Sequence, residues 1–539
     1  MKELLAEEHF DKQQDLISAV EKFTLMHDRR QLSPAESRYR ELIPKRTPGP
    51  GQQYAFEVNL DQCTGCKACV VACHHENGLE EDETWRSVGL IHGGTTQEPV
   101  TQHVTTACHH CLAPGCLTGC PVNAYEKNLV NGIVKHLDDQ CIGCQYCTFT
   151  CPYDVPKYIP KKGIVHKCDM CISRLDVGQA PACVRACPSE AIRITLVDVA
   201  QIKERPTDYV KIPDAPDSRF TLPTTQYKTK RVFPGNMVST DFYSLKPQHS
   251  HLPLMAMLVL TQLSVGTFCA GLFWRSHYHI FIALGVGLLA LAASVFHLGR
   301  PLYGFRAVLG LKRSWLSREI VAFGIFTLLA IGYALNIGQN FLSIATAVSG
   351  VIGVFCSVMV YKVTKRPFWD NHATMMKFFL TTGILGISGM LFIEMMVVRA
   401  GLACLPAGRC PSIVELPNGQ PPGLPLLCVL TMILTTIKLI AETLILFRLG
   451  DHELTSLKKT ALLLTGPLKS AMQKRFLFGL AGGILLPFLF LGFGAQLDPI
   501  VMTGMAVAIF IFSLIGEFLE RYLFFRAVVP LKMPGGKAI

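Results

Sequence analysis

The sequence predicts a cysteine-rich α+β domain followed by an all-α bundle of eight transmembrane helices. Sixteen of the twenty-one cysteines lie between Cys63 and Cys187, in four runs of four. From about residue 250 onward, apolar segments of roughly 20 residues dominate, and a helix of that length crosses a bilayer. Half of the residues are hydrophobic and the mean hydropathy is +0.33, which also indicates residence in a membrane.

The net charge of +11 does not indicate nucleic-acid binding. No nucleic-acid recognition motif accompanies it, and the basic residues lie in short loops between apolar segments. Such a distribution is typical of membrane topology. We therefore expect no nucleic-acid partner.

The chain divides into four predicted parts. Residues 1–50 comprise an amphipathic helix and a polar linker; the helix packs on its own domain or, in the alternative, docks a partner subunit. Acidic residues interrupt its apolar positions, so we do not expect a secretory signal peptide. Residues 51–200 form the cysteine-rich domain, residues 201–250 a proline-rich strap, and residues 251–539 the membrane domain.

Four runs of cysteines carry the chemistry of the first domain. Two of them have the spacing C-x2-C-x2-C-x3-C, in which three thiolates hold one iron-sulfur cube and the fourth reaches the other cube of a pair. A disulfide framework or zinc sites are the alternatives, because C-x2-C pairs also bind zinc. Four complete quartets, three of them followed by proline as in bacterial ferredoxins, favour clusters. The runs are Cys63, Cys66, Cys69 and Cys73; Cys108, Cys111, Cys116 and Cys120; Cys141, Cys144, Cys147 and Cys151; and Cys168, Cys171, Cys183 and Cys187.

Short predicted strands flank these runs. Residues 54–60 precede the first run, residues 132–137 precede the third, and residues 191–196 follow the fourth. The order of strand, cysteine loop, helix and strand is that of a ferredoxin-like unit, and we expect this unit twice. Four histidines beside the runs are expected to donate hydrogen bonds or to lie at the surface, because every run already supplies four thiolates. They are His74, His75, His109 and His110.

Eight segments are predicted to span the membrane, and an even number returns the C-terminus to the side of the N-terminus. Their approximate extents are 251–274, 279–299, 317–337, 341–361, 375–398, 424–447, 476–493 and 498–525. We count twenty Lys and Arg residues on the side of the cysteine-rich domain, Lys377, Arg475 and Arg521 among them, against three on the other side. This positive-inside bias, and sixteen thiolates that suit a reducing compartment, predict that the domain lies on the cytoplasmic face of the inner membrane.

Ionisable residues inside spans are costly and are usually functional or paired. Those that fall toward the cytoplasmic ends of their spans are His297, Glu319, Lys438, Glu442 and Glu517. Lys438 and Glu442 are four residues apart and are expected to neutralise each other. The alternative for the whole set is hydrogen bonding between helices.

The segment from Cys63 to Cys187 resembles the four-cluster iron-sulfur subunit of dimethyl sulfoxide reductase-type molybdoenzymes. Residues 294–301, Ser-Val-Phe-His-Leu-Gly-Arg-Pro, and residues 317–320, Ser-Arg-Glu-Ile, resemble the eight-helix anchor subunit of the same enzymes. The chain therefore looks like a fusion of two normally separate subunits. The resemblance implies that the first run pairs with the fourth and the second with the third, giving four 4Fe-4S clusters in line.

The resemblance also implies a separate catalytic subunit that carries molybdopterin. The favoured function is transfer of electrons from membrane quinol, menaquinol or ubiquinol, through the clusters to that subunit in anaerobic respiration. The alternative is the reverse flow, from a partner dehydrogenase of the formate or polysulfide type to quinone. An assembly or anchoring protein with structural clusters is a third class, which four clusters and the intramembrane charges disfavour. In the first two cases the chain transfers electrons and does not itself reduce the terminal substrate.

His297 and Glu319 are the predicted quinol site. His297 ends the second span and Glu319 begins the third, so we expect both at one depth beneath the cysteine-rich domain. Quinol oxidation releases two electrons and two protons, and a histidine and a partly buried carboxylate suit proton acceptance and positioning. The anchor resemblance supports this pair, whereas the sequence alone leaves structural pairing equally open. Arg300 and Arg318 are expected either to hold the carboxylate ionised or to dock the cysteine-rich domain.

Five cysteines lie outside the runs. Cys404 and Cys410 fall in a long loop on the predicted outer side, where we expect a disulfide between them. Cys269, Cys356 and Cys428 lie within spans and are expected to be small core residues.

Overall fold

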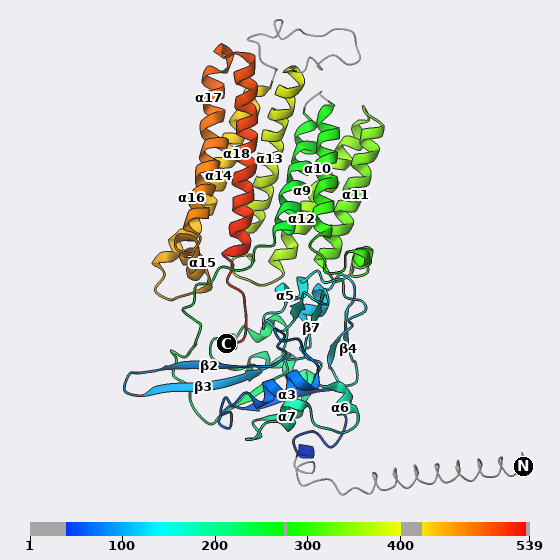
Figure 1. Cartoon of the computed structure of the whole chain (residues 1–539), viewed down its shortest axis with the longest axis vertical. Helices are drawn as coiled ribbons and strands as arrows, with labels where there is room; N and C mark the ends of the chain where they lie inside the picture. The colour runs from blue at the N-terminus through cyan, green and yellow to red at the C-terminus, as the bar shows by residue number, and fades with distance from the viewer. Residues whose placement is uncertain (1–38, 274–276, 400–422, 535–539) are drawn as a thin grey trace, which may run out of the picture.

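The computed structural model describes residues 39–273, 277–399 and 423–534. In Figure 1 the cysteine-rich domain lies below an upright bundle of long helices, which confirms the predicted fold class. The chain returns to the cysteine-rich domain after the last helix, where Met533 packs into the core of that domain. The helix expected within residues 1–50 begins outside the described residues, as does the expected bridge between Cys404 and Cys410.

Ten strands occur in the described part of the cysteine-rich domain and strap. They are β1 (Gln52–Asn59), β2 (Ser87–Gly94), β3 (Pro99–Thr106), β4 (Tyr125–Lys127), β5 (Val134–His136), β6 (Lys157–Ile159), β7 (Ile164–His166), β8 (Ile192–Asp198), β9 (Gln226–Lys228) and β10 (Val238–Ser239). In one sheet β1 lies between β8, which is antiparallel to it, and β9, which is parallel. In a second three-stranded sheet β2 lies between β3 and β10, and the β2–β3 hairpin projects sideways in Figure 1. The pairs β4–β5 and β6–β7 form two smaller sheets.

The three predicted strands correspond to β1, β5 and β8. Phe56 on β1 lies opposite Ile194 on β8, and both side chains are buried, so an apolar cross-strand pair supports the sheet. The strap differs from the expectation of a loop, because it supplies β9 and β10 to the two sheets. The end of the predicted linker is also packed, since Leu42 is buried and its carbonyl accepts a hydrogen bond from the amide of Ile194 at 2.9 Å.

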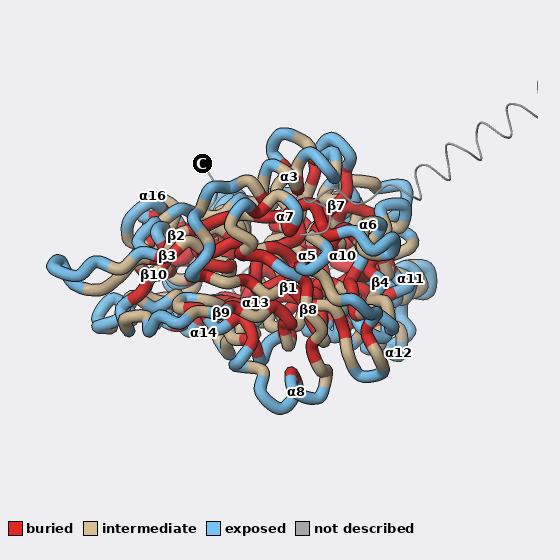
Figure 2. Tube along the Cα trace, turned by 90° about the horizontal axis from the view of Figure 1, so that it is seen from below, coloured by how far each residue is buried: buried red, intermediate tan, exposed pale blue. Residues whose placement is uncertain are grey.

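Short helices begin within or beside the cysteine runs. They are α3 (Ala68–Glu76), α4 (Gly115–Gly119), α5 (Tyr146–Thr150), α6 (Ile172–Asp176), α7 (Ala182–Arg185) and α8 (Val199–Glu204). Lys67, Gln145 and Cys171, which immediately precede α3, α5 and α6, have φ angles of 61°, 59° and 50°. Non-glycine residues adopt this left-handed conformation rarely, and here it turns the backbone sharply between neighbouring cysteines. Viewed from below in Figure 2, the buried centre of the domain is ringed by exposed loops.

Eight helical segments in the described residues are long and apolar enough to cross a membrane. They are built from α9 (Leu252–Gly271), α10 (Tyr278–Val295), α11 (Trp315–Leu335), α12 (Asn340–Lys362), α13 (His372–Arg399), α14 (Leu424–Thr443), α16 (Lys469–Leu480) joined by a π-helical turn to α17 (Leu486–Phe493), and α18 (Pro499–Arg526). A short helix, α15 (Ser456–Thr465), precedes α16 at the end of the bundle nearest the cysteine-rich domain (Figure 1).

Two groups of helices make up the bundle, α9 to α12 and α13 to α18, and α9 packs against α13 where they meet (Figure 1). At this crossing a Cβ added to Gly386 would lie 2.2 Å from the backbone carbon of Gly266. Small residues let transmembrane helices approach closely, and here only glycine leaves room.

The cysteine-rich domain and the bundle also meet backbone to backbone. A Cβ added to Gly299, in the loop after α10, would lie 2.2 Å from the carbonyl oxygen of Gly163. The amide of Gly310 donates to the carbonyl of Pro121 at 2.7 Å, and Ser314 Oγ donates to the carbonyl of Gly119 at 2.6 Å. The α10–α11 loop therefore holds the cysteine-rich domain against the bundle.

Candidate functional site

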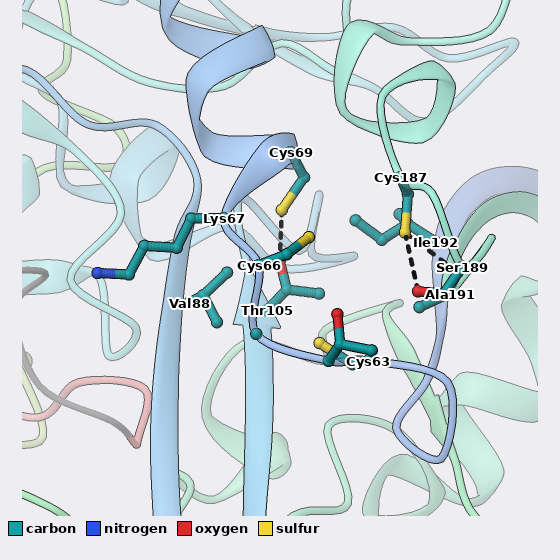
Figure 3. A pocket seen from close by; sticks show the side chains of 12 residues that line it. Cys63, Cys66, Lys67, Cys69, Val88, Thr105, Cys187, Ser189, Ala191 and Ile192 are labelled. Carbon is teal, nitrogen blue, oxygen red and sulfur yellow. Dashed lines mark hydrogen bonds between the residues drawn. The ribbon is translucent and has the colours of Figure 1, made fainter.

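The first and fourth cysteine runs meet around one space. Figure 3 shows Cys63, Cys66, Cys69 and Cys187 lining the same pocket. The amide of Ala191 donates to Cys187 Sγ at 3.2 Å, so the backbone supports this thiol. Cys66 is exposed, which brings this quartet to the surface of the domain.

The last cysteine of the first run lies with the rest of the fourth. Burial, and then the neighbouring thiol of Cys183, raise the pKa of Cys73 to about 12, and Cys171 adds to the effect. Burial and then Cys73 raise the pKa of Cys168. These four thiols form a second group.

The second and third runs exchange their last cysteines in the same way. Cys108, Cys111, Cys116 and Cys151 line a second pocket. Cys120 instead lies among thiols of the third run, because burial and then Cys120 raise the pKa of Cys144. Cys141 and Cys147 complete that group. Each group thus takes three thiols from one run and one from another, which is the pairing that the resemblance implies.

The donor set fits iron-sulfur clusters. None of the nineteen cysteines in the described residues forms a disulfide. Within those residues no three His, Cys, Asp or Glu side chains are grouped so as to hold a single metal ion. Backbone amides also face the sulfurs: Gly143 N donates to Cys141 Sγ and Met170 N to Cys168 Sγ, both at 3.4 Å. Hydrogen bonds to sulfur are one of the means by which proteins tune cluster potentials.

Two histidines beside the second run bond to protein groups. His109 Nδ1 lies 2.8 Å from Thr225 Oγ1, and the amide of Val134 donates to His110 Nδ1 at 3.0 Å. Burial lowers the pKa of His109 to about 3 and that of His110 well below its usual value, so both rings are neutral near pH 7. Both are buried rather than at the surface, and His110 accepts a hydrogen bond at Nδ1, so the expectation of a donor or a surface residue is wrong for His110.

The group that contains Cys120 and the third run lies nearest the bundle. Cys144 and Tyr146 pack against the apolar core of the bundle, and Tyr146 Oη donates to the carbonyl of Val360 at 2.7 Å. Ala307, from the α10–α11 loop, packs into the core around the same thiols. This group is therefore the one through which the bundle and the cysteine-rich domain are in closest contact.

His297 and Glu319 meet the same cysteine loop. His297 follows α10 and lies near the backbone of Cys144; burial lowers its pKa, and this contact reverses only part of the shift. Glu319, in the first turns of α11, is 4% exposed and accepts a hydrogen bond from Ser357 on α12. Burial and then the charge of Glu319 raise the pKa of Tyr146. The loop from Cys144 to Tyr146 therefore lies near both predicted residues.

Two residues at this site escaped the sequence analysis. Tyr146 stands between Cys144 and Cys147, and this position inside a cysteine run could have indicated that it lies at the site. His251, at the start of α9, has its ring centroid 5.4 Å from that of His297, and burial together with His297 lowers its pKa to about 4. The position of His251 directly before the first apolar segment could have indicated a residue at the membrane end of the cysteine-rich domain.

The structure assigns different tasks to the two arginines near Glu319. Arg300 donates through its backbone amide to the carbonyl of Ile142 at 3.0 Å and through Nη1 to the carbonyl of Asp138 at 2.8 Å, so it docks the cysteine-rich domain. Arg318 packs 4.4 Å from the ring of Trp315 and bonds to carbonyls of its own loop. Neither of the two expected roles therefore applies to Arg318.

A cluster of buried charges fills the second group of helices near the cysteine-rich domain. Its members are Lys377 on α13, Lys438 and Glu442 on α14, Arg475 on α16, and Glu517, Glu520 and Arg521 on α18. We call this set the charge cluster.

Glu517 is the centre of the charge cluster. It accepts hydrogen bonds from Lys438 Nζ, from Arg475 Nη2 at 3.0 Å and from Thr381 Oγ1 at 2.7 Å. Arg475 also holds Glu442 through two nitrogens, at 2.9 and 3.0 Å. Glu517, Lys438, Arg475 and Glu442 thus balance one another inside the bundle, as buried ions usually do.

One sequence-based interpretation is extended here and another needs correction. Lys438 and Glu442 form the expected pair, 3.9 Å apart, but each has a closer partner: Glu517 for Lys438 and Arg475 for Glu442. Lys377, Arg475 and Arg521 were counted as loop cations, yet they are buried in helices. The error arose because all three stand near the polar ends of apolar segments.

Comparison with known protein families identifies both halves of the chain. Residues 100–196 match the family described as 4Fe-4S dicluster domain, and residues 247–526 match the family described as DMSO reductase anchor subunit (DmsC).

Individual relatives cover the cysteine-rich half. The B subunit of anaerobic dimethyl sulfoxide reductase from Haemophilus influenzae is 35% identical over 192 residues, which are 33% of this chain and 91% of that protein. The protein of the same name from Escherichia coli is 33% identical over 184 residues, 33% of this chain and 88% of the relative. The formate dehydrogenase iron-sulfur subunit of H. influenzae is 35% identical over 153 residues, 25% of this chain but only 49% of the relative.

Proposed function

Because this chain belongs to the DMSO reductase anchor family, as a fusion of that anchor with a 4Fe-4S dicluster domain, we propose that it oxidises membrane quinol at His297 and Glu319. The electrons pass through four 4Fe-4S clusters to a separate molybdopterin-containing catalytic subunit. In this assignment residues 51–200 carry the electrons and residues 251–539 form the anchor, menaquinol or ubiquinol being the donor. The cysteine loop from Cys144 to Tyr146 carries the proposal, because it adjoins both His297 and Glu319.

The two residues divide the proton chemistry between them. Glu319 accepts the proton of a quinol hydroxyl, and the hydrogen bond from Ser357 orients its carboxyl group. His297, kept neutral because its pKa is lowered, offers a ring nitrogen that positions the second hydroxyl and accepts its proton, so both protons released on oxidation have an acceptor. When bound, the clusters supply one-electron carriers that separate the two electrons of quinol.

The thiol groups support a linear route away from the bundle. The group of Cys120, Cys141, Cys144 and Cys147 receives the electrons, since it lies against the bundle. Next comes the group of Cys108, Cys111, Cys116 and Cys151, and then that of Cys73, Cys168, Cys171 and Cys183. The last is that of Cys63, Cys66, Cys69 and Cys187, whose exposed Cys66 suits transfer to a partner.

The cysteine-rich domain is proposed to face the cytoplasm. Three of the counted cations belong to the charge cluster, but the loops on the side of the cysteine-rich domain keep an excess of Lys and Arg without them. Sixteen thiols in groups also favour a reducing compartment.

Reverse flow, from a partner dehydrogenase to quinone, is the second candidate. Similarity to a formate dehydrogenase iron-sulfur subunit favours it, whereas the match of the membrane half to the DMSO reductase anchor favours quinol oxidation. Clusters reduced by quinol, in the isolated chain and in the absence of a partner, would support the first direction. Re-oxidation of pre-reduced clusters by quinone, with no reduction by quinol, would support the second.

The metal content tests the cluster assignment. If all four thiol groups are filled, the purified chain should hold about sixteen irons and as many acid-labile sulfides, four of each per cluster. Anaerobic purification followed by iron, sulfide and zinc analysis measures this. A reproducible content of half the iron or less, with zinc making up the remainder, would contradict the assignment.

A further inference from the structure

Arg86 is a buried cation in the centre of the cysteine-rich domain. It stands immediately before β2, and its side chain is 2% exposed. Nη1 donates to Thr105 Oγ1 at 3.1 Å, and the guanidinium lies 4.6 Å from the centroid of the Phe56 ring. Nε and Nη2 have no hydrogen-bond partner among the described residues. Two of its three nitrogens are thus left without a protein acceptor.

Arg86 has no carboxylate to balance its charge within the described residues. The groups that act on it most strongly are instead the sulfurs of Cys183, Cys69, Cys168 and Cys73. An unpaired buried guanidinium is costly, so a compensating negative charge is required. A 4Fe-4S cluster held by four thiolates carries net negative charge, and the cysteines around Arg86 are those that would hold two such clusters.

These sulfurs belong to two different groups. Cys69 is part of the group at the surface, and its Sγ lies 3.6 Å from Thr105 Oγ1, the same oxygen that anchors Arg86. Cys73, Cys168 and Cys183 belong to the next group toward the bundle. The guanidinium is therefore placed between the two.

Lys167 is a second buried cation between two thiol groups, and it lies closer to the bundle than Arg86. It is 2% exposed, and its Nζ donates to the carbonyls of Val134 and Cys168, the latter at 2.8 Å. It lines the same pocket as Cys108 and Cys116 and bonds to the backbone of Cys168, so it lies between these two thiol groups. Cations and thiol groups thus alternate along the proposed route.

We propose that Arg86 and Lys167 are positioning residues for electron transfer, fixed positive charges that each serve two neighbouring clusters and raise their reduction potentials. The inference rests on the four-cluster assignment of the proposed function. Reduction adds one electron, and so one negative charge, to a cluster, and a nearby cation stabilises the reduced state more than the oxidised one. A cation between two clusters also reduces the repulsion that a second electron meets.

The test compares two substitutions at Arg86 in the full membrane-bound chain. Arg86→Gln removes the charge but keeps an amide donor for Thr105, and Arg86→Lys keeps the charge. Arg193→Gln is the matched control, because Arg193 is half exposed on β8 and its partner is Glu57, 3.7 Å away. Iron content is measured first, and midpoint potentials are then determined by mediated redox titration followed by electron paramagnetic resonance, with no quinol present.

With full iron content, Arg86→Gln should lower the midpoint potentials of two clusters and leave the other two unchanged. Arg86→Lys should restore most of the shift, and Arg193→Gln should change nothing. Unaltered potentials in Arg86→Gln at full iron content would overturn the proposal.

If Arg86→Gln loses iron, its potentials cannot be compared with those of the wild type, and the Arg86→Lys variant then decides between the two roles. Full iron and near-normal potentials in Arg86→Lys would show that the charge is what the site needs, whereas loss of iron there too would assign Arg86 a packing role and overturn the proposal. A wild-type chain that never holds about sixteen irons would instead count against the four-cluster assignment itself. The two failures are therefore distinguishable.

Discussion

Glu319→Gln should slow the reduction of the clusters by quinol about 100-fold or more, the usual loss when a general base is removed. The glutamine keeps the shape of the side chain and can still bond to Ser357, but it cannot accept a quinol proton. Stopped-flow measurement of cluster bleaching after mixing with a reduced quinol analogue gives the rate. Reduction by dithionite, which bypasses the quinol site, should be unchanged.

His297→Ala should likewise slow the reduction of the clusters by quinol and leave their reduction by dithionite unchanged. The matched control is Glu394→Gln. Glu394 is a buried carboxyl on α13, in the half of the bundle away from the cysteine-rich domain. It should react with quinol at the wild-type rate. If both site variants keep wild-type rates with quinol while their iron content is intact, the quinol site lies elsewhere, and the charge cluster becomes the next candidate.

Glu517→Leu should destabilise the bundle by about 3–5 kcal/mol, because it leaves Lys438 and Arg475 without their common partner. Removal of one member of a buried ion pair leaves the other charge buried without a partner to offset its cost of desolvation. The free energy of unfolding in detergent micelles, from a denaturant titration, measures the effect. Glu453→Leu, the same exchange at an exposed position after α14, should cost little.

The double variant Lys438→Met/Glu517→Leu distinguishes pairing from packing. Apolar residues in place of both partners should recover much of the stability lost in the single variant, and Arg475 keeps its two bonds to Glu442. A double variant as unstable as the sum of the two single variants would show that Lys438 and Glu517 do not act as a pair.

The iron-sulfur half was readable from the sequence because its signal is local. Three thiols of each of two runs are fixed by spacing within a dozen residues, and strands such as residues 54–60 carry their apolar pattern in the chain itself. The strap strands escaped notice because β9 and β10 are only three and two residues long. Such segments form by pairing with a sheet already present and have no periodicity of their own.

The charge cluster could not be assembled from the sequence, although several of its members were noticed. The pairing of Lys438 with Glu442 follows from helical spacing, but Arg475 and Glu517 reach them from two other helices. Which side chain is nearest depends on how α14, α16 and α18 pack, and no local pattern encodes that. The same holds for Tyr146, which acquires its place beside Glu319 only when the two halves dock.

The charge cluster also constrains the biogenesis of this protein. An ionised side chain at the centre of a lone span costs about 2.5–3.5 kcal/mol on insertion scales, and less toward its ends. The spans of α14, α16 and α18 each carry at least one such side chain, toward the end near the cysteine-rich domain. Arg475 finds Glu517 only after the last span has been synthesised, so we expect the final three spans to leave the translocon together. A chain truncated before α18 should then be degraded faster than the full chain, whereas a fragment as long-lived as the full chain would show that the spans enter the lipid one at a time.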